Sequence, residues 1–193
     1  MHYRDDKFGK KTIGGLDAKL TKFPNKICAR CNNARTQPHD RAWEFLSNAL
    51  RTRTPKLAPG NIVRVNRIFR YDAARQMLNV HLFFVKQFGG MILEGSAPID
   101  IKPFATAIMM NKAHACVYLK FGCGTTLAGN PLISRSDLRV DTRRNGSCAH
   151  ASWIYNVEGI AVQATFAEHG MQSGYGWWHP SLGTSRLLMA DMR

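Results

Sequence analysis

The residues with the most direct chemical potential are Cys28 and Cys31, which form the chain's only C-x-x-C pair. Two thiolates at this spacing can hold one side of a tetrahedral Zn²⁺ site, and the metal then needs two further ligands. No second pair of this kind supplies them, so the alternative is a reduced pair that holds no metal. The candidate additional ligands are His2, His39, Cys116, Cys123, Cys148 and His150.

A helix is predicted to begin shortly after the cysteine pair. Pro38 suits the first turn of a helix, where its missing N–H is not needed. Apolar residues from Ala42 to Leu50 recur at spacings of three and four, which predicts an amphipathic helix at about 38–52. His39 would lie in its first turn, as a candidate acid–base residue or as a surface residue that contacts phosphate.

Positive charge is concentrated in the first third of the chain. Residues 1–70 carry 16 Lys and Arg against 5 Asp and Glu, whereas residues 71–193 carry 11 against 8. A local excess of +11 favours a polyanionic partner, and we expect nucleic acid, either DNA or RNA. The alternative is a basic surface that only keeps the protein soluble. The candidate phosphate contacts are Lys22, Lys26, Arg30, Arg35, Arg41 and Arg51.

After Pro59-Gly60 the sequence pattern changes and predicts a β-rich part. Residues 61–70 and 77–85 alternate in polarity around a polar turn, which predicts a hairpin followed by a short strand at 91–93. Further predicted elements are a helix at 103–110, a strand at 115–121, and a second hairpin formed by 152–157 and 160–167.

Two groups of aromatic residues could contact a partner. Trp177 and Trp178 near the C-terminus could pack in the core, stack on bases or meet a protein partner. The second candidate nucleic-acid face combines basic and aromatic side chains. Its members are Arg64, Arg67, Arg70, Phe69, Tyr71, Phe83 and Phe84.

The segment around the cysteine pair resembles the second half of an HNH endonuclease motif. A glycine pair, Asn25, the C-x-x-C pair, Asn32 and Arg35 follow one another in the family's order. The resemblance implies a ββα unit that binds a divalent metal at the scissile phosphate. It implies that Asn25 positions a loop, that Asn32 helps to hold the metal, and that Arg35 is the trailing basic residue. Cys28 and Cys31 would then be half of a structural zinc site.

The first half of that motif has no counterpart in this sequence. Neither an upstream C-x-x-C nor an H-x-x-P stands before the glycine pair, so the family's water-activating histidine is missing. The resemblance covers only about residues 9–45. Either the sequence begins after the first half, or the protein is a degenerate relative that binds and no longer cuts.

We therefore expect an α+β protein in which a basic zinc-knuckle and helix module, residues 1–56, precedes a β-rich domain. That domain, residues 57–193, would be a mainly antiparallel sheet with short helices. The expected function is nucleic-acid binding by a relative of HNH endonucleases. The alternatives are an active nuclease that needs Mg²⁺ or Mn²⁺, and a protein-interaction or inhibitor module that uses Trp177 and Trp178.

The sequence gives no sign of a membrane segment or a secretory leader. No apolar run approaches the ~20 residues that a membrane helix needs. The first residues carry charges with no apolar stretch behind them. Five cysteines at irregular spacing do not form a disulfide framework, so we expect a cytoplasmic protein in a reducing compartment.

Overall fold

The computed structural model describes residues 2–5, 9–12, 34–124, 132–170, 176–183 and 185–192. Within these ranges the helices are α1 (Gln37–Arg51), α2 (Ala73–Glu94) and α3 (Lys102–Met110). The strands are β1 (His2–Asp5), β2 (Gly9–Thr12), β3 (Ile62–Arg64), β4 (Val117–Cys123), β5 (Leu132–Arg135), β6 (Arg139–Thr142), β7 (Cys148–Val157), β8 (Ile160–Ala167), β9 (Trp177–Trp178), β10 (Arg186–Leu188) and β11 (Ala190–Asp191). The predicted fold class, α+β with a mainly antiparallel sheet, is confirmed.

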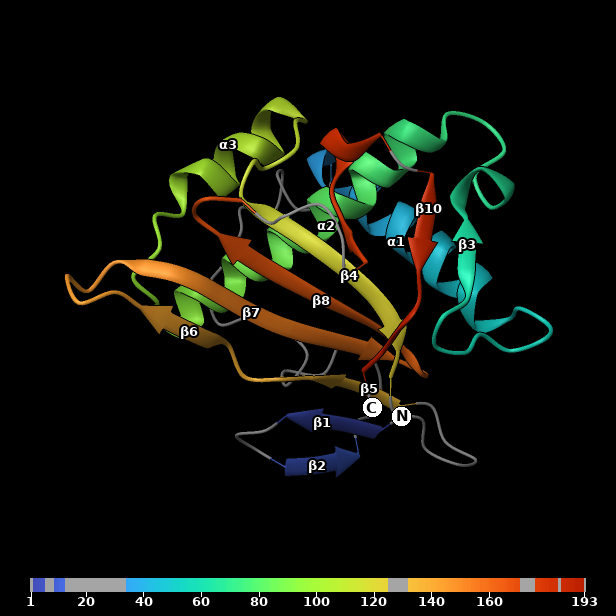
Figure 1. The fold of residues 1–193 in the computed structure, drawn as a ribbon, viewed down its shortest axis with the longest axis horizontal. Helices are drawn as coiled ribbons and strands as arrows, with labels where there is room; N and C mark the ends of the chain where they lie inside the picture. Colours follow the sequence, from blue (N-terminus) through green and yellow to red (C-terminus); the bar gives the residue numbers. More distant parts are fainter. Residues whose placement is uncertain are drawn as a thin grey trace.

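Most of the described strands form one twisted sheet (Figure 1). Its order is β11-β4-β8-β7-β5-β1-β2, with β6 beside β7 and β9 beside β4. Among the strands that the structure describes, only the β1–β5 and β11–β4 pairs are parallel. The hairpin predicted from 152–157 and 160–167 is confirmed as β7 and β8, joined at Glu158 and Gly159, which both have positive φ. Two such residues make the turn type that suits the twist of a tight hairpin.

The hairpin predicted for 61–70 and 77–85 is wrong in its second strand, because residues 73–94 form α2. The strand predicted at 91–93 belongs to the same helix. Met77, Val80, Phe84 and Phe88 are buried at helical spacing, and Leu82 between them is buried as well. A helix that is buried on most sides has a nearly continuous run of apolar residues. Alternating polarity within such a run therefore does not distinguish a strand from a helix.

Helix α2 lies behind the sheet in Figure 1, and α1 packs against α2. Trp43 of α1 meets Phe84 edge-on, with ring centroids 4.8 Å apart, and also approaches Tyr155 of β7. The helices predicted at 38–52 and 103–110 are confirmed as α1 and α3. Phe104 anchors α3 to α2 by contact with the Phe88 ring. One hydrophobic core therefore joins α1, α2, α3 and the sheet.

A separate two-stranded ribbon is formed by β3 and β10. Val63 and Leu187 face inward and are 0% and 1% exposed. The strand predicted over 61–70 is thus limited to three residues, and a 3₁₀ turn, η3 (Val65–Arg67), follows it. No helix in the described part of the chain is long and apolar enough to cross a membrane.

Candidate functional site

Most residues of the HNH-like segment lie outside the described residues. These are Lys22, Asn25, Lys26, Cys28, Arg30, Cys31 and Asn32. The roles predicted for them, including zinc at Cys28 and Cys31, stay predictions. The structure does place His39, Arg35, Arg41 and Arg51.

His39 is buried at the start of α1. Burial lowers the pKa of its imidazole, a hydrogen bond with the Asn111 side chain opposes this, and the nearby Lys86 charge lowers the pKa further. Beside it, the Lys86 ammonium reaches out of α2 to Asp40 Oδ1 at 2.5 Å and to Thr36 Oγ1 at 3.3 Å. A neutral, enclosed imidazole next to this ion pair holds the first turn of α1 in place. The acid–base role predicted for His39 stays a prediction.

The three predicted arginines of this region differ in exposure and in whether a carboxylate already pairs with them. Arg35 and Arg41 are exposed, and Arg35 contacts the sulfur of Met109. Arg51 is half-buried, because its guanidinium pairs with Glu158 at the β7–β8 turn and also donates to the Ser47 carbonyl. Arg51 therefore fastens α1 to the sheet, whereas Arg41 is available at the surface.

Five exposed cations follow α1 and form a surface that we call the basic ridge. Its members are Arg53, Lys56, Arg64, Arg67 and Arg70. Among the described residues, none of them has a carboxylate within ion-pair distance. The only carboxylate between α1 and α2 is Asp72, which stands 4.0 Å from Arg75. Figure 1 shows this connection, with β3 and the turns on either side of it, along one side of the molecule.

Aromatic side chains accompany the ridge. Tyr71 is 87% exposed immediately after Arg70. Phe45 of α1, 55% exposed, stacks on the buried ring of Phe69 with centroids 5.4 Å apart. Phe83 and Phe84 do not belong to this face, because both are buried in α2. Phe69 is buried as well and reaches the surface only through its contact with Phe45, so the second face proposed from the sequence keeps its arginines and Tyr71 and loses its three phenylalanines.

The β3–β10 ribbon adds to the positive charge of this side. Arg186 is paired in register with Arg64, so both cations stand on the outer face of the ribbon. Ile62 and Leu188, both exposed, occupy the same face two residues away.

The aromatic pair near the C-terminus is divided between two environments. Trp178 is buried in β9, which pairs with β4. Trp177 is half-exposed, and the Lys120 ammonium lies 5.4 Å from its ring centroid. Trp178 is therefore a core residue, and only Trp177 presents a surface to a partner.

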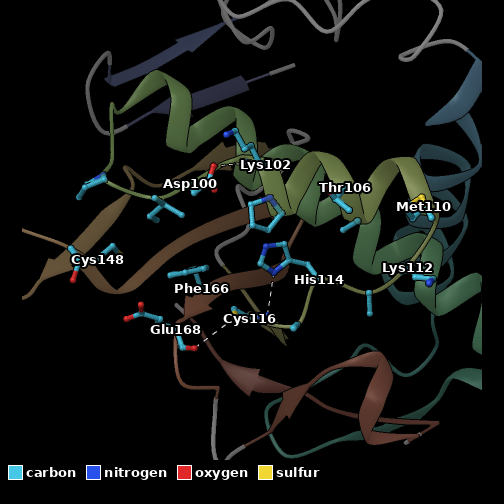
Figure 2. Close-up of a pocket in the computed structure, with 17 residues that line it drawn as sticks. Asp100, Lys102, Thr106, Met110, Lys112, His114, Cys116, Cys148, Phe166 and Glu168 are labelled. Carbon is cyan, nitrogen blue, oxygen red and sulfur yellow. Dashed lines mark hydrogen bonds between the residues drawn. The ribbon is translucent and has the colours of Figure 1, made fainter.

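A pocket of about 790 Å³ opens between α3 and the ends of β7 and β8 (Figure 2). Its inner wall includes the imidazole of His114, which Figure 2 shows between α3 and Phe166. The other lining residues that concern us are Ile99, Asp100, Lys102, Pro103, Thr106, Lys112, Cys116, Cys148 and Glu168. No sequence pattern indicates this pocket, because its walls come from three separate segments.

Three buried histidines meet behind this pocket. The backbone N–H of His114 donates to His81 Nε2 at 3.1 Å, and His179 Nε2 donates to the His114 carbonyl at 3.0 Å. Burial lowers the pKa of all three imidazoles, that of His114 to about 4. The three rings are therefore neutral near pH 7 and act as hydrogen-bonding groups rather than as charges.

The described residues contain no group of three or more His, Cys, Asp or Glu side chains that could hold a metal ion. Cys116 and Cys148 are thiols without a disulfide, and burial raises the pKa of both. His150, a candidate ligand, lies 3.3 Å from Asp141 instead. The cysteine pair itself lies outside the described ranges and needs only two further ligands, so the zinc site predicted there stays a prediction.

Comparisons with protein families, with curated proteins and with solved structures found no match.

Proposed function

We propose that this protein binds nucleic acid through the basic ridge. The observation that carries the proposal is the set of five exposed cations between α1 and α2 that have no carboxylate partner among the described residues. Surface cations on ordinary soluble proteins are interspersed with carboxylates. An acid-free cluster instead creates a local positive potential that attracts a polyanion.

The ridge supplies two kinds of contact that nucleic acids use. Arginine binds phosphate with a planar, bidentate guanidinium, which favours it over lysine at such sites. An exposed tyrosine such as Tyr71 can stack on an unpaired base. Bound phosphates would release counterions, so binding should weaken steeply as salt is added.

The proposal also accommodates the resemblance to HNH endonucleases. In the sequence, the C-x-x-C-N segment leads directly into α1, and the other end of α1 leads directly into the ridge. A phosphate-binding segment at each end of one helix suits a protein that follows a nucleic-acid backbone. Binding without cleavage is the form that we propose, because the sequence lacks the family's water-activating histidine.

The test is a fluorescence-anisotropy titration of the full chain with labelled single- and double-stranded DNA and RNA. The ridge variant Arg67→Gln/Arg70→Gln should weaken binding about tenfold or more, because two charge-assisted phosphate contacts are lost. The matched control is Arg139→Gln/Arg144→Gln, which removes the same charge from exposed positions on or next to β6. No binding by the parent chain, or equal losses in both variants, would reject the ridge as the binding surface.

The same titrations distinguish binding from cutting. Samples are incubated with Mg²⁺ or Mn²⁺ and the nucleic acid is resolved by length. Intact nucleic acid fits the proposed function. Cleavage that disappears in Asn32→Ala would instead establish the active nuclease that the resemblance implies.

A further inference from the structure

His114, which lines the pocket beside α3, has a buried hydrogen-bond donor without a partner among the described residues. The Cys116 N–H donates to His114 Nδ1 at 3.1 Å, so the ring proton of the neutral imidazole sits on Nε2. His114 is 5% exposed, and among the described residues its Nε2 has no hydrogen-bond partner. A buried donor left in this state costs free energy, which an acceptor atom brought by a ligand would recover.

The walls next to this donor are flat and largely apolar. Phe104 packs behind His114 with ring centroids 4.2 Å apart and lies 6.2 Å from Phe166 in a stacked arrangement. Phe166 also lines the pocket, together with Ile99 and Pro103. A planar ring is the ligand shape that such walls accommodate best.

The rim of the pocket carries an excess of positive charge. Lys102 and Lys112 are exposed, and neither has a carboxylate within ion-pair distance in the described ranges. Of the two carboxylates of the lining, Glu168 pairs with Arg143 at 2.5 Å, and Asp100 accepts the Lys102 backbone N–H at 2.9 Å, a bond that does not neutralise it. Lys102, Lys112 and Arg143 outnumber these two carboxylates, so the net charge at the rim is positive, which favours an anionic group there.

We propose that this pocket binds a planar heteroaromatic ring that carries a phosphate, as in a nucleoside monophosphate. The ring accepts the hydrogen bond of His114 Nε2 and lies against Phe166, and the phosphate meets Lys112. A cavity of about 790 Å³ is within the size range of small-ligand sites. A free nucleotide and the terminal nucleotide of a strand share this chemistry.

The inference does not depend on the basic ridge. In Figure 1, α3 and β3 lie on opposite sides of the molecule. Substitutions at the pocket and at the ridge can therefore be tested separately, and either proposal can fail while the other stands.

The experiment titrates the full chain with the four common 5′-nucleoside monophosphates, with a 5′-phosphorylated trinucleotide and with inorganic phosphate. Heat is measured by calorimetry, and the His114 imidazole is followed by NMR of protein with ¹⁵N-labelled histidine. We expect saturable binding of at least one nucleotide and a shifted Nε2 resonance. The Lys112→Gln variant should bind about tenfold more weakly, because a charged phosphate contact is lost.

Thr106→Trp is the blocking variant, because Thr106 is exposed on α3 and lines the mouth of the pocket. The matched control is Ala105→Trp, the exposed neighbouring residue that does not line it. Thr106→Trp should abolish binding without lowering the melting temperature, and Ala105→Trp should leave both unchanged. The change in the His114 Nε2 resonance that nucleotide causes in the parent chain should be absent in Thr106→Trp and present in Ala105→Trp.

Each outcome decides the proposal. Monophosphates that bind as tightly as the trinucleotide identify a free nucleotide as the ligand, and binding of the trinucleotide alone identifies a strand end. The proposal is overturned if no probe shifts the His114 resonance. It is also overturned if inorganic phosphate binds as tightly as the nucleotides, or if binding survives Thr106→Trp.

Discussion

Lys86 shows how a single buried charge fixes the beginning of α1. Its ammonium is almost completely enclosed and is balanced by Asp40 and by the Thr36 hydroxyl, two residues that stand in or next to the first turn of that helix. A buried ion pair is weak evidence of net stability, but the loss of one partner leaves an unbalanced charge. The pair therefore ties the residues after the HNH-like segment to α2.

Asp40→Asn should lower the free energy of unfolding by about 2 kcal/mol, because Lys86 keeps its charge and loses its carboxylate. The measurement is urea unfolding of the variant and the parent. Lys86→Met in the same chain should recover part of this loss, since the apolar side chain needs no partner. If the changes in the free energy of unfolding caused by Asp40→Asn and Lys86→Met simply add in the double variant, the two side chains do not stabilise each other.

The buried histidines make stability dependent on pH in the acid range. The pKa of His114 lies near 4 in the folded protein, below its ordinary value of 6.5, so the unfolded chain binds more protons between these values. The neutral His114 imidazole makes its full contribution to the free energy of unfolding above pH 6.5. This contribution is lost as the pH falls towards 4, which lowers the free energy of unfolding by about 3 kcal/mol. His81 and His179 shift in the same direction.

Urea midpoints measured across this range test the effect. In His114→Gln the loss on the acid side should be smaller than in the parent chain, whatever the variant's stability at neutral pH. A profile that stays equally steep in His114→Gln would contradict the assignment.

At the scale of elements, local patterns in the sequence identified those elements that have one buried face. α1, α3, β4 and the β7–β8 hairpin were predicted correctly because each alternates or repeats with a clear period. α2 was missed because α1 packs on one side of it and the sheet lies on the other, which leaves Leu82 and Phe84 equally buried. The sequence contains no polar stripe there to reveal the helical period.

The two candidate sites also differ in whether the sequence alone could predict them. The arginines of the ridge are close in sequence, so their clustering could be predicted without a structure. The His114 pocket could not, because Ile99, His114 and Phe166 come together only when α3 packs against the sheet. The tautomer of His114 depends on a backbone N–H two residues later, which no sequence pattern records.

Two glycines in regular elements should respond to substitution in opposite ways. Gly89 lies inside α2, and a Cβ there would contact Phe104 at an ordinary 3.8 Å. Gly89→Ala should therefore stabilise the protein by about 1 kcal/mol, since alanine favours the helix.

Gly122→Ala should destabilise it by about 2 kcal/mol, because the new Cβ would lie 2.6 Å from the Ala190 carbonyl and push β11 away from β4. Thermal unfolding of the two variants beside the parent checks both signs. A stabilised Gly122→Ala or a destabilised Gly89→Ala would show that α2 or the β4 edge is packed differently.

At the scale of the whole molecule, charge and packing are separated in space. The core joins α1, α2, α3 and the sheet, while the five cations of the basic ridge, which have no carboxylate partner among the described residues, lie on the connection that leaves α1. Elsewhere in the described ranges, Arg51, Arg135 and Arg143 are paired with carboxylates, whereas Lys102 and Lys112 beside the pocket are not. This asymmetry gives the molecule one side suited to a polyanion.

The most direct test of nucleic-acid binding by the ridge is the slope of log affinity against log salt concentration. The parent chain should show a steep negative slope on duplex DNA. The slope of Arg67→Gln/Arg70→Gln should be shallower by about 1.8, because each lost phosphate contact removes about 0.9. Arg139→Gln/Arg144→Gln should follow the parent line. Parallel lines for the parent and the ridge variant, or an equal change in the control, would contradict the claim that the ridge holds the backbone.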